Sequence, residues 1–425
     1  MRRIVCFGPG PKFKGGISNY NTSLAKALDK RGDCEVHIVS WTNQYPAIIP
    51  REFVDKSSKT DLLEGTNIQV KYITNYNNPA SWNATARYIA DLKPEIVIIQ
   101  WAIAIQGLPL SRIAKKLNKY SDIEVIFDLH FVIQKENSNI DRYFTKLAIK
   151  HADTYLVHAL KTKYELDELF PDKTLKLNET GERVGNSQEK LVIKLYHPIY
   201  DLFKPDPTFD PVAFKKDHNL KKHVFLFFGF IRKYKGLHHT IRAFAKVAEK
   251  RDDVSLLICG ESFWNTLDNK KLSTKVKSFL FSLAKGAFLK KKDDEGEYNP
   301  LALIDELGIA DRTMLVNKFV PNEEVPQYFQ VSDAVVLFYE YATPSGIESL
   351  SYNFKKPLLA TAVGHFPETI DDGFNGYLAK AEDIDDMAAV MEKYLDKPLD
   401  PENVSVKTKD MSWENYAKAI LADHT

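Results

Sequence analysis

Short apolar runs bounded by turn-forming residues alternate along this chain with segments in which apolar residues recur every three or four positions. The first pattern is typical of buried β-strands, and the second is typical of amphipathic helices. In the first half we expect strands at residues 3–7, 34–39, 68–73, 95–100, 123–128, 154–158 and 191–196. In the second half we expect them at residues 224–229, 254–259, 313–318, 333–338, 357–361 and 376–379. The regular alternation of strands and helices predicts an α/β fold built on parallel sheets.

The length predicts more than one domain, because 425 residues exceed what one ordinary hydrophobic core accommodates. Residues 197–222 contain four prolines and are typical of an interdomain linker. We therefore predict two doubly wound, Rossmann-like domains that face each other across a cleft, residues 1–200 and residues 201–411. A helix capped by Ser412 is predicted within residues 412–425, and we expect it to pack back on the N-terminal domain. Ligands of such sheets bind beyond the carboxyl ends of the strands, so functional residues should directly follow strands.

The composition is that of a globular protein, with 44% hydrophobic and 27% charged residues. The formal net charge is only +1, so nothing in the overall charge favours a nucleic-acid partner. Three widely spaced cysteines, Cys6, Cys34 and Cys259, lie in strand-like runs, which predicts buried free thiols in a reducing compartment. The first apolar run is too short for a signal-peptide core, and no segment is long enough to span a bilayer. We therefore expect a cytoplasmic location.

One lysine-rich segment, residues 263–297, is longer than a strand-to-helix connection needs and predicts an insertion in the second domain. Its centre, residues 271–292, alternates apolar and basic side chains. A basic amphipathic stretch suits the surface of an anionic bilayer, which would make the protein peripheral on the inner face of a membrane. An inserted helix that covers its own domain and leaves its lysines in water explains the pattern as well.

Two segments of the second half carry the features of an anion site. The strand at residues 224–229 ends at Gly229, and the basic residues Arg232 and Lys235 follow it. Later, Ser345 and Gly346 open a predicted helix, where small residues leave backbone N–H groups directed at an anion. Cations from one loop and a helix N-terminus from another can enclose a diphosphate without a metal ion. This combination predicts an enzyme that uses a nucleotide sugar.

The same segments resemble glycosyltransferase family 4, whose members have the two-domain GT-B fold. The chain is most similar to a bacterial subgroup with the motifs GGI near the N-terminus, FFGFIRxYKGL, and TQSGI followed by a KP strand. The corresponding residues are 15–17, 227–237, 343–347 and 356–357. The resemblance spans nearly the whole chain. It implies transfer of a sugar with retention of the anomeric configuration, with the donor phosphate able to accept the proton of the acceptor hydroxyl.

The resemblance also implies roles for individual residues. Arg232 and Lys235 would bind the donor diphosphate and stabilise the departing nucleotide, although structural salt bridges would also explain them. Gly15 and Gly16 would let the first loop approach the donor closely, or would form an ordinary tight turn. His130 would contact the donor sugar or support the reaction centre, or would be a structural histidine. Ser345, Gly346 and Ile347 open a predicted helix, and their backbone amides would donate hydrogen bonds to the donor diphosphate. A plain helix cap is the alternative.

The acidic residues depart from the family pattern. Glu340 and Glu348 have the spacing of the E-x7-E pair that binds the donor, but counting from Lys356-Pro357 and from Gly346 places the family glutamates elsewhere. A loop carboxylate and an exposed residue in the first turn of a helix are the alternatives. Glu368 matches a family position near the cleft, and His365 replaces a family glycine. No convincing metal motif is present, since Asp383 and Asp385 are typical of a helix start, so we expect neither a metal nor any other cofactor.

The sequence therefore predicts a glycosyltransferase that moves a sugar from a nucleoside-diphosphate sugar to a hydroxyl of a glycan or a lipid-linked glycan. Two alternatives stay open. A nucleotide-sugar epimerase or a phosphorylase would use the same fold, and a catalytically silent GT-B scaffold would explain the altered glutamates.

Overall fold

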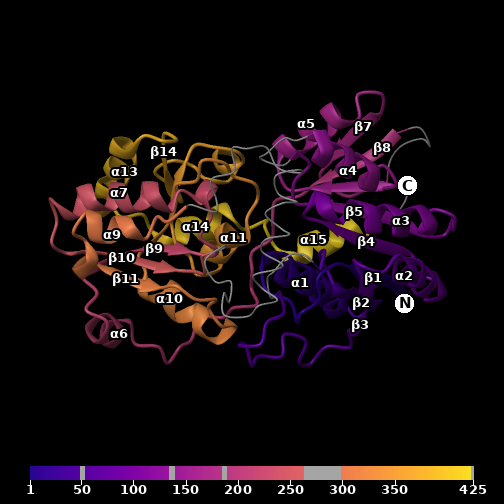
Figure 1. The fold of residues 1–425 in the computed structure, drawn as a ribbon, viewed down its shortest axis with the longest axis horizontal. Coiled ribbons are helices and arrows are strands. Elements are labelled where there is room, and N and C mark those ends of the chain that lie inside the picture. Colours follow the sequence, from indigo (N-terminus) through magenta and orange to yellow (C-terminus); the bar gives the residue numbers. More distant parts are fainter. Residues whose placement is uncertain (48–52, 134–138, 184–188, 263–297, 423–425) are drawn as a thin grey trace.

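The structure is a computed structural model, and it describes residues 1–47, 53–133, 139–183, 189–262 and 298–422. Within these residues the chain forms two parallel β-sheets, one in each half, and Figure 1 shows each sheet with its own helices. The α/β class and the two-sheet architecture agree with the sequence prediction. The predicted insertion at residues 263–297, with its basic stretch at 271–292, lies outside the described residues.

The N-terminal sheet has eight strands in the order β3-β2-β1-β4-β5-β6-β8-β7. The strands are β1 (Arg2–Phe7), β2 (Cys34–Asn43), β3 (Gln69–Asn75), β4 (Ile96–Trp101), β5 (Glu124–Leu129), β6 (Thr154–Val157), β7 (Thr174–Asn178) and β8 (Glu189–Lys194). Its helices are α1 (Gly16–Lys30), α2 (Pro79–Asp91), α3 (Gly107–Leu117), α4 (Asn139–Ile149) and α5 (Leu160–Leu169). The sequence did not predict β7, because this edge strand buries only Leu175 and lacks an apolar run.

The C-terminal sheet has six strands in the order β11-β10-β9-β12-β13-β14. They are β9 (His223–Phe228), β10 (Val254–Cys259), β11 (Thr313–Val316), β12 (Ala334–Leu337), β13 (Leu358–Thr361) and β14 (Gly376–Ala379). The helices of this half are α6 (Pro211–Asp217), α7 (Leu237–Ala248), α9 (Ala302–Glu306), α10 (Val325–Val331), α11 (Gly346–Asn353), α12 (Phe366–Thr369), α13 (Ile384–Asp396) and α14 (Pro401–Lys407). In both sheets the first strand lies in the middle, so the winding direction reverses between β1 and β4 and between β9 and β12. Loops diverge at such reversals and leave room for a ligand.

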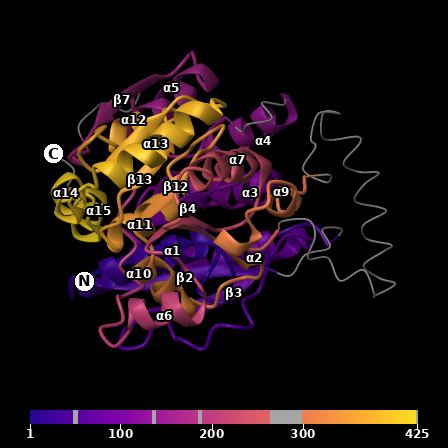
Figure 2. The ribbon, with the colours of Figure 1, turned by 90° about the vertical axis from the view of Figure 1, so that its left-hand side faces the viewer.

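Side chains alternate along the strands and build a core on each face of the sheets. In β9, Phe225 and Phe227 pack with α7 and α13, whereas Val224 and Leu226 point to the opposite face, toward α10 and α11. Figure 2 shows this domain end-on, with α7 and α13 on one side and α10 on the other. The core on the α10 and α11 face continues into the N-terminal half through Tyr20 and Leu24 of α1. The two domains therefore share one apolar cluster.

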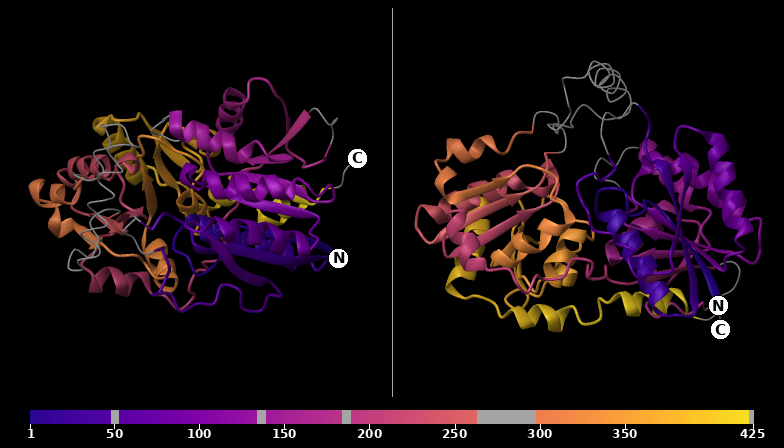
Figure 3. Two further views of the ribbon diagram at one scale, coloured as in Figure 1. Left: turned by 45° about the vertical axis from the view of Figure 1, so that its right-hand side comes forward. Right: turned by 90° about the horizontal axis from the view of Figure 1, so that it is seen from below.

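The last helix, α15 (Trp413–Ile420), packs against α1 of the N-terminal domain although it follows the C-terminal domain in sequence. Figure 1 places it beside α1, and the view from below in Figure 3 shows the C-terminal segment passing from one domain to the other. Ser412 caps the helix by accepting a hydrogen bond from the Asn415 amide at 3.1 Å. Trp413, Tyr416 and Ile420 are buried on the inner face.

The three cysteines are buried and free, as the sequence predicted. Among the described residues, we find no helix that combines the length and the apolar character needed to cross a membrane.

Candidate functional site

A cavity of about 220 Å³ opens between the two domains at the carboxyl ends of β1, β9 and β10. Six of the site residues predicted from the sequence line it, namely Gly15, Gly16, Lys235, Ser345, Gly346 and Ile347. The other five, Arg232, His130, Glu340, Glu348 and Glu368, lie elsewhere among the described residues. Folding therefore brings the glycine loop, the basic turn and the Ser-Gly helix start into one space.

The turn after β9 carries the buried cation of the cavity. Residues Lys233–Lys235 form a single 3₁₀ turn, and Gly236 then adopts a left-handed conformation with φ of 62° before α7 begins. The turn leaves the Lys235 side chain only 9% exposed, with its ammonium group at the cavity wall beside Gly229. Arg232 is half-buried, and its guanidinium carbon lies 5.5 Å from the Tyr234 ring centroid.

Two helix N-termini end at the cavity. Helix α1 begins at Gly16 and α11 begins at Gly346, so the partial positive charge of both helix dipoles is directed to the same space. Ser345 caps α11, since its hydroxyl accepts the Ile347 amide at 3.2 Å. Gly15 has φ of 104°, and a Cβ there would meet only Phe230, at 4.0 Å, so a side chain would project into the cavity. This arrangement suits an anion that approaches the backbone closely.

Further charges and an apolar wall complete the cavity. Lys14 and Lys318 add two cations, while Asp55 and Glu261 add two carboxylates. The Lys14 ammonium lies 4.7 Å from the Phe319 ring centroid, and Lys318 pairs with Glu324 at 3.1 Å. The apolar wall consists of Phe13, Phe203, Phe228, Phe230, Phe319, Val320, Val325 and Leu350. Lys14, Lys318 and this wall were not predicted from the sequence, because they become neighbours only in the folded chain.

Glu348 is buried and does not lie in an exposed helical turn. Its carboxylate accepts hydrogen bonds from the His365 imidazole, the Thr369 hydroxyl and the Tyr352 hydroxyl, the last at 3.1 Å. Burial alone would raise the pKa of Glu348, but His365 and these hydrogen bonds outweigh it and hold the pKa below its ordinary value. Glu348 and His365 line a second, much smaller cavity beside His158 and His197. His365, a departure from the family pattern, is thus the partner of Glu348.

Glu368 and Glu340 have different surroundings again. The Glu368 carboxylate accepts the backbone N–H of Leu160 at 3.2 Å, so it caps α5 of the opposite domain. Glu340 lies in the loop after β12, with its carboxylate 3.5 Å from the His238 imidazole and 3.6 Å from the His239 imidazole. Neither glutamate lines the cavity between the domains.

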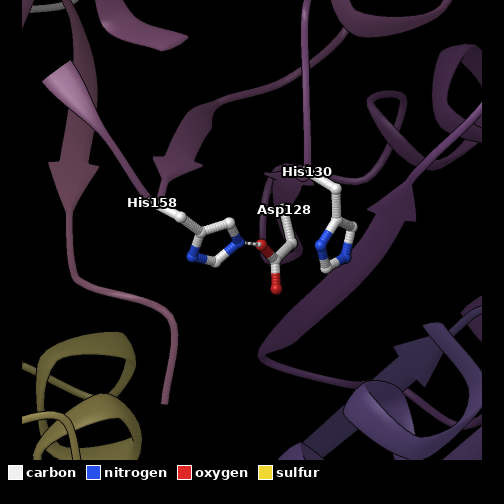
Figure 4. Close-up of side chains that lie close together, drawn as sticks. All are labelled: Asp128, His130 and His158. Atoms are coloured by element: carbon white, nitrogen blue, oxygen red, sulfur yellow. Dashed lines mark hydrogen bonds and ion pairs between the residues drawn. The ribbon is translucent and has the colours of Figure 1, made fainter. Parts of the chain in front are cut away.

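His130 belongs to a buried network at the carboxyl edge of the N-terminal sheet. Figure 4 shows the Asp128 carboxylate between the imidazoles of His130 and His158. His158 lies 2.9 Å from Asp128, and His130 lies 2.8 Å from the side-chain oxygen of Gln100. Burial lowers the pKa of His130 to about 4, so its ring is neutral near pH 7. Asp128, His130 and His158 are grouped closely enough for a cation, but the Nε2 atoms of both histidines are already in short contacts, that of His158 with Asp128 and that of His130 with Gln100.

One other expectation has a definite structural outcome. Asp383 is the N-cap of α13, accepting the Asp386 amide at 3.0 Å, and Asp385 pairs with Lys246. The Asp383 and Asp385 spacing is therefore that of a helix start, as predicted.

The architecture defines the class of fold. Several chains of known structure share this architecture over nearly their whole length. One is the Anabaena protein Alr3699/HepE in complex with UDP-glucose, which has a TM-score of 0.64 and 14% identity. The match covers 99% of this chain and 98% of the Anabaena chain. Sucrose-phosphate synthase from Thermosynechococcus elongatus has a TM-score of 0.60 and 14% identity, covering 99% and 95% of the two chains. At this identity the likeness concerns the fold, and the fold is GT-B.

The sequence comparisons identify the second half of the chain more closely. Residues 209–418 match the family described as "Glycosyl transferases group 1", so this half is a glycosyltransferase group 1 domain. The chain is also 32% identical over 131 residues to D-inositol 3-phosphate glycosyltransferase of Mycolicibacterium smegmatis. That match covers 29% of this chain and 29% of the relative, so the similarity extends over less than a third of the relative's length.

Proposed function

We propose that the protein is a glycosyltransferase that transfers a sugar from a nucleoside-diphosphate sugar to a hydroxyl of a glycan or lipid-linked glycan acceptor. One observation carries the proposal: Lys235, the Gly15-Gly16 loop and the start of α11 meet at one cavity between two domains. A buried ammonium group and two helix N-termini together form a strong site for a diphosphate. The group 1 domain at residues 209–418 supports the same reaction class.

The cavity also supports a nucleotide as the leaving group. Its apolar wall suits a base, and the basic turn lies beside it, as a nucleoside diphosphate requires. Proteins with this fold have been solved in complex with UDP, UDP-glucose or glucose-6-phosphate, which favours UDP as the first nucleotide to test.

In the proposed mechanism Lys235 binds the donor diphosphate and stabilises the negative charge that develops as the glycosidic bond breaks. The Gly346 amide, at a position where a helix leaves N–H groups without intrahelical acceptors, would donate to a phosphate oxygen. The donor phosphate would accept the proton of the attacking hydroxyl, with retention of the anomeric configuration. Fixed cations then take the place of a divalent ion at the diphosphate, so no metal would be needed there.

The test compares the wild type with Lys235→Ala and with Lys233→Ala as a matched control. Lys233 lies in the same 3₁₀ turn but does not line the cavity. We expect UDP to raise the melting temperature of the wild type and of Lys233→Ala, with or without magnesium, and to have little effect on Lys235→Ala. Turnover of Lys235→Ala should fall by about 10²- to 10³-fold, as when one donor to a developing charge is removed.

The outcomes separate the alternatives. Equal UDP stabilisation of Lys235→Ala and the wild type would exclude Lys235 as the diphosphate ligand. Nucleotide binding without turnover across a panel of acceptors would favour a silent scaffold, and consumption of the donor without an acceptor would favour an epimerase. Proton NMR of the product tests retention, and turnover that rises on addition of magnesium or manganese would contradict a metal-free mechanism.

The proposal also includes a glycan or lipid-linked glycan as the acceptor, a cytoplasmic location, and contact of residues 271–292 with an anionic bilayer surface. These three parts rest on the sequence patterns alone.

A further inference from the structure

Three potential metal ligands meet outside the cavity between the domains. His238 and His239 are in the first turn of α7, and Glu340 is in the loop that leads from β12 toward α11. Their ligand atoms all lie within 4.8 Å of one another, and the two imidazole rings are 3.9 Å apart between centroids. The three side chains are 13–18% exposed, which leaves a path for an ion from solvent.

The spacing of these atoms suits a shared cation better than direct hydrogen bonds. The Nε2 atoms of His238 and His239 lie 3.5 Å and 3.6 Å from the same carboxylate oxygen, Oε1 of Glu340. A good N–H···O hydrogen bond has a donor–acceptor distance of about 2.7–3.2 Å. A tetrahedral zinc site with bonds of about 2.1 Å places neighbouring ligand atoms about 3.4 Å apart. Both observed distances are close to that edge length.

His239 supplies an independent observation. Both of its ring nitrogens are buried and neither has a hydrogen-bond partner among the described residues. Buried polar atoms in folded proteins are nearly always paired, and an unpaired one calls for a bound water or ion.

The second nitrogen of His238 is also arranged as in metal sites. Its Nδ1 lies 2.9 Å from the Tyr298 hydroxyl, which in addition accepts the His238 backbone N–H at 3.2 Å. A metal-binding histidine usually makes such a contact through its other ring nitrogen, because the contact fixes the ring orientation and the tautomer. Tyr298 therefore holds His238 with Nε2 directed to Glu340.

We propose that His238, His239 and Glu340 bind one divalent first-row transition-metal ion, with Zn²⁺ favoured by two imidazoles and one carboxylate. The three ligands leave a fourth position for water. None of the three lines the cavity between the domains, so the ion does not touch the diphosphate site and the inference does not depend on the proposed function. The ion joins the start of α7, directly after Lys235, to the loop that precedes α11. The ion therefore connects two segments whose neighbouring residues, Lys235 and Ser345, line the cavity.

The test measures metal binding to the full chain after removal of metal by a chelator. Zn²⁺ is titrated in competition with a chromophoric chelator, and Co²⁺ serves as a spectroscopic probe of coordination geometry. The variants are His239→Ala, the isosteric Glu340→Gln, and Tyr298→Phe. His223→Ala is the matched control, because His223 Nε2 also lies 3.6 Å from a carboxylate, that of Asp253, but the described residues form no group of three metal ligands there.

We expect one Zn²⁺ per wild-type chain and a visible Co²⁺ spectrum of a tetrahedral site. Tyr298→Phe should weaken binding by about 10- to 100-fold, as for partners that support a metal ligand, and His239→Ala and Glu340→Gln should weaken it at least as much. His223→Ala should bind as the wild type does. Absence of stoichiometric binding to the wild type, or equal affinity in all variants, overturns the proposal. If His239→Ala does not fold, as judged by circular dichroism, Glu340→Gln and Tyr298→Phe decide the outcome.

Discussion

Glu340 and Glu348 have the same spacing as a donor-binding pair, yet their surroundings differ completely. Glu340 faces two histidines of α7, whereas Glu348 is buried among His365, Thr369 and Tyr352. A buried carboxylate is tolerated where hydrogen bonds replace its hydration. At the scale of the single residue, Glu348 is therefore a structural anion that ties α11 to the loop before α12.

This role predicts a pH-dependent contribution of Glu348 to stability. Its pKa in the folded chain lies below the ordinary value of 4.5. Such a carboxylate contributes stability that is fully present above about pH 4.5 and is lost as the pH falls through the folded pKa. We expect Glu348→Gln to lower the free energy of unfolding at pH 7 by about 1.5–3 kcal/mol, the contribution of a hydrogen bond to a charged group. The deficit should shrink as the pH is lowered from 5 toward 3.

Urea unfolding of both proteins across this pH range checks the prediction. The control is Glu414→Gln, which removes an exposed glutamate from the first turn of α15. The control should differ little from the wild type at any pH. A Glu348→Gln deficit that stays constant from pH 7 to pH 3 would show that the charge is not what stabilises the site.

At the scale of elements, Tyr200 connects the two helix starts at the cavity. Its hydroxyl donates to the Gly16 carbonyl at 2.7 Å, and its ring packs on Gly346, the first residue of α11. A Cβ at position 346 would lie 2.6 Å from Tyr200 Cε2, well inside van der Waals contact. Glycine is thus required at 346 by the approach of a neighbouring ring.

We expect Gly346→Ala to lower the free energy of unfolding by about 1–3 kcal/mol, as overpacking does in a packed interior. It should also reduce stabilisation by UDP, because the displaced Tyr200 would shift the first turn of α1. Thermal unfolding with and without UDP measures both effects. Adding Tyr200→Ala should relieve part of the penalty, giving a coupling energy of about 0.5–3 kcal/mol in a double-mutant cycle. Strict additivity of the two changes would contradict the proposed clash.

At the scale of the whole molecule, α15 packs against the N-terminal domain although it comes after the C-terminal domain in sequence. Tyr416 of this helix lies 3.4 Å from the buried carboxylate of Asp128 and contacts the Tyr20 hydroxyl. Arg183 holds the end of the helix through the carbonyls of Ala419 and Ile420, at 3.0 Å and 2.6 Å. The stability of the N-terminal domain therefore depends on residues at the far end of the sequence.

We expect Tyr416→Ala to destabilise the N-terminal domain by about 3–5 kcal/mol, the usual cost of truncating a large buried aromatic side chain. Lys418→Ala, on the exposed face of the same helix, should change stability by less than about 0.5 kcal/mol. Hydrogen exchange resolves the effect by domain. In Tyr416→Ala the amides of β1 and β4 should exchange faster, while those of β9 and β10 keep their protection. Faster exchange confined to β9 and β10 would contradict the prediction, because it would show that α15 stabilises the C-terminal domain instead.

The sequence by itself determined the class of fold and singled out six of the residues that line the cavity between the domains. Apolar runs marked the central strands because these strands are buried on both faces. Strand β7 was not predicted, because an edge strand needs no such run. Lys235, the glycine loop and the Ser-Gly helix start could be singled out because each follows a strand or opens a helix, and phosphate-binding groups commonly occupy such positions.

Only the tertiary structure decided which of these residues share a space. The same spacing of glutamates placed Glu348 in a buried hydrogen-bonded cluster and Glu340 beside two histidines, because their partners come from distant segments. The grouping of His238, His239 and Glu340 leaves no sequence motif for the same reason. Likewise, α15 is recognisable as a helix from its own residues, but its place against α1 depends on a surface assembled elsewhere in the chain. Local patterns specify elements, whereas contacts between elements depend on how the whole chain packs.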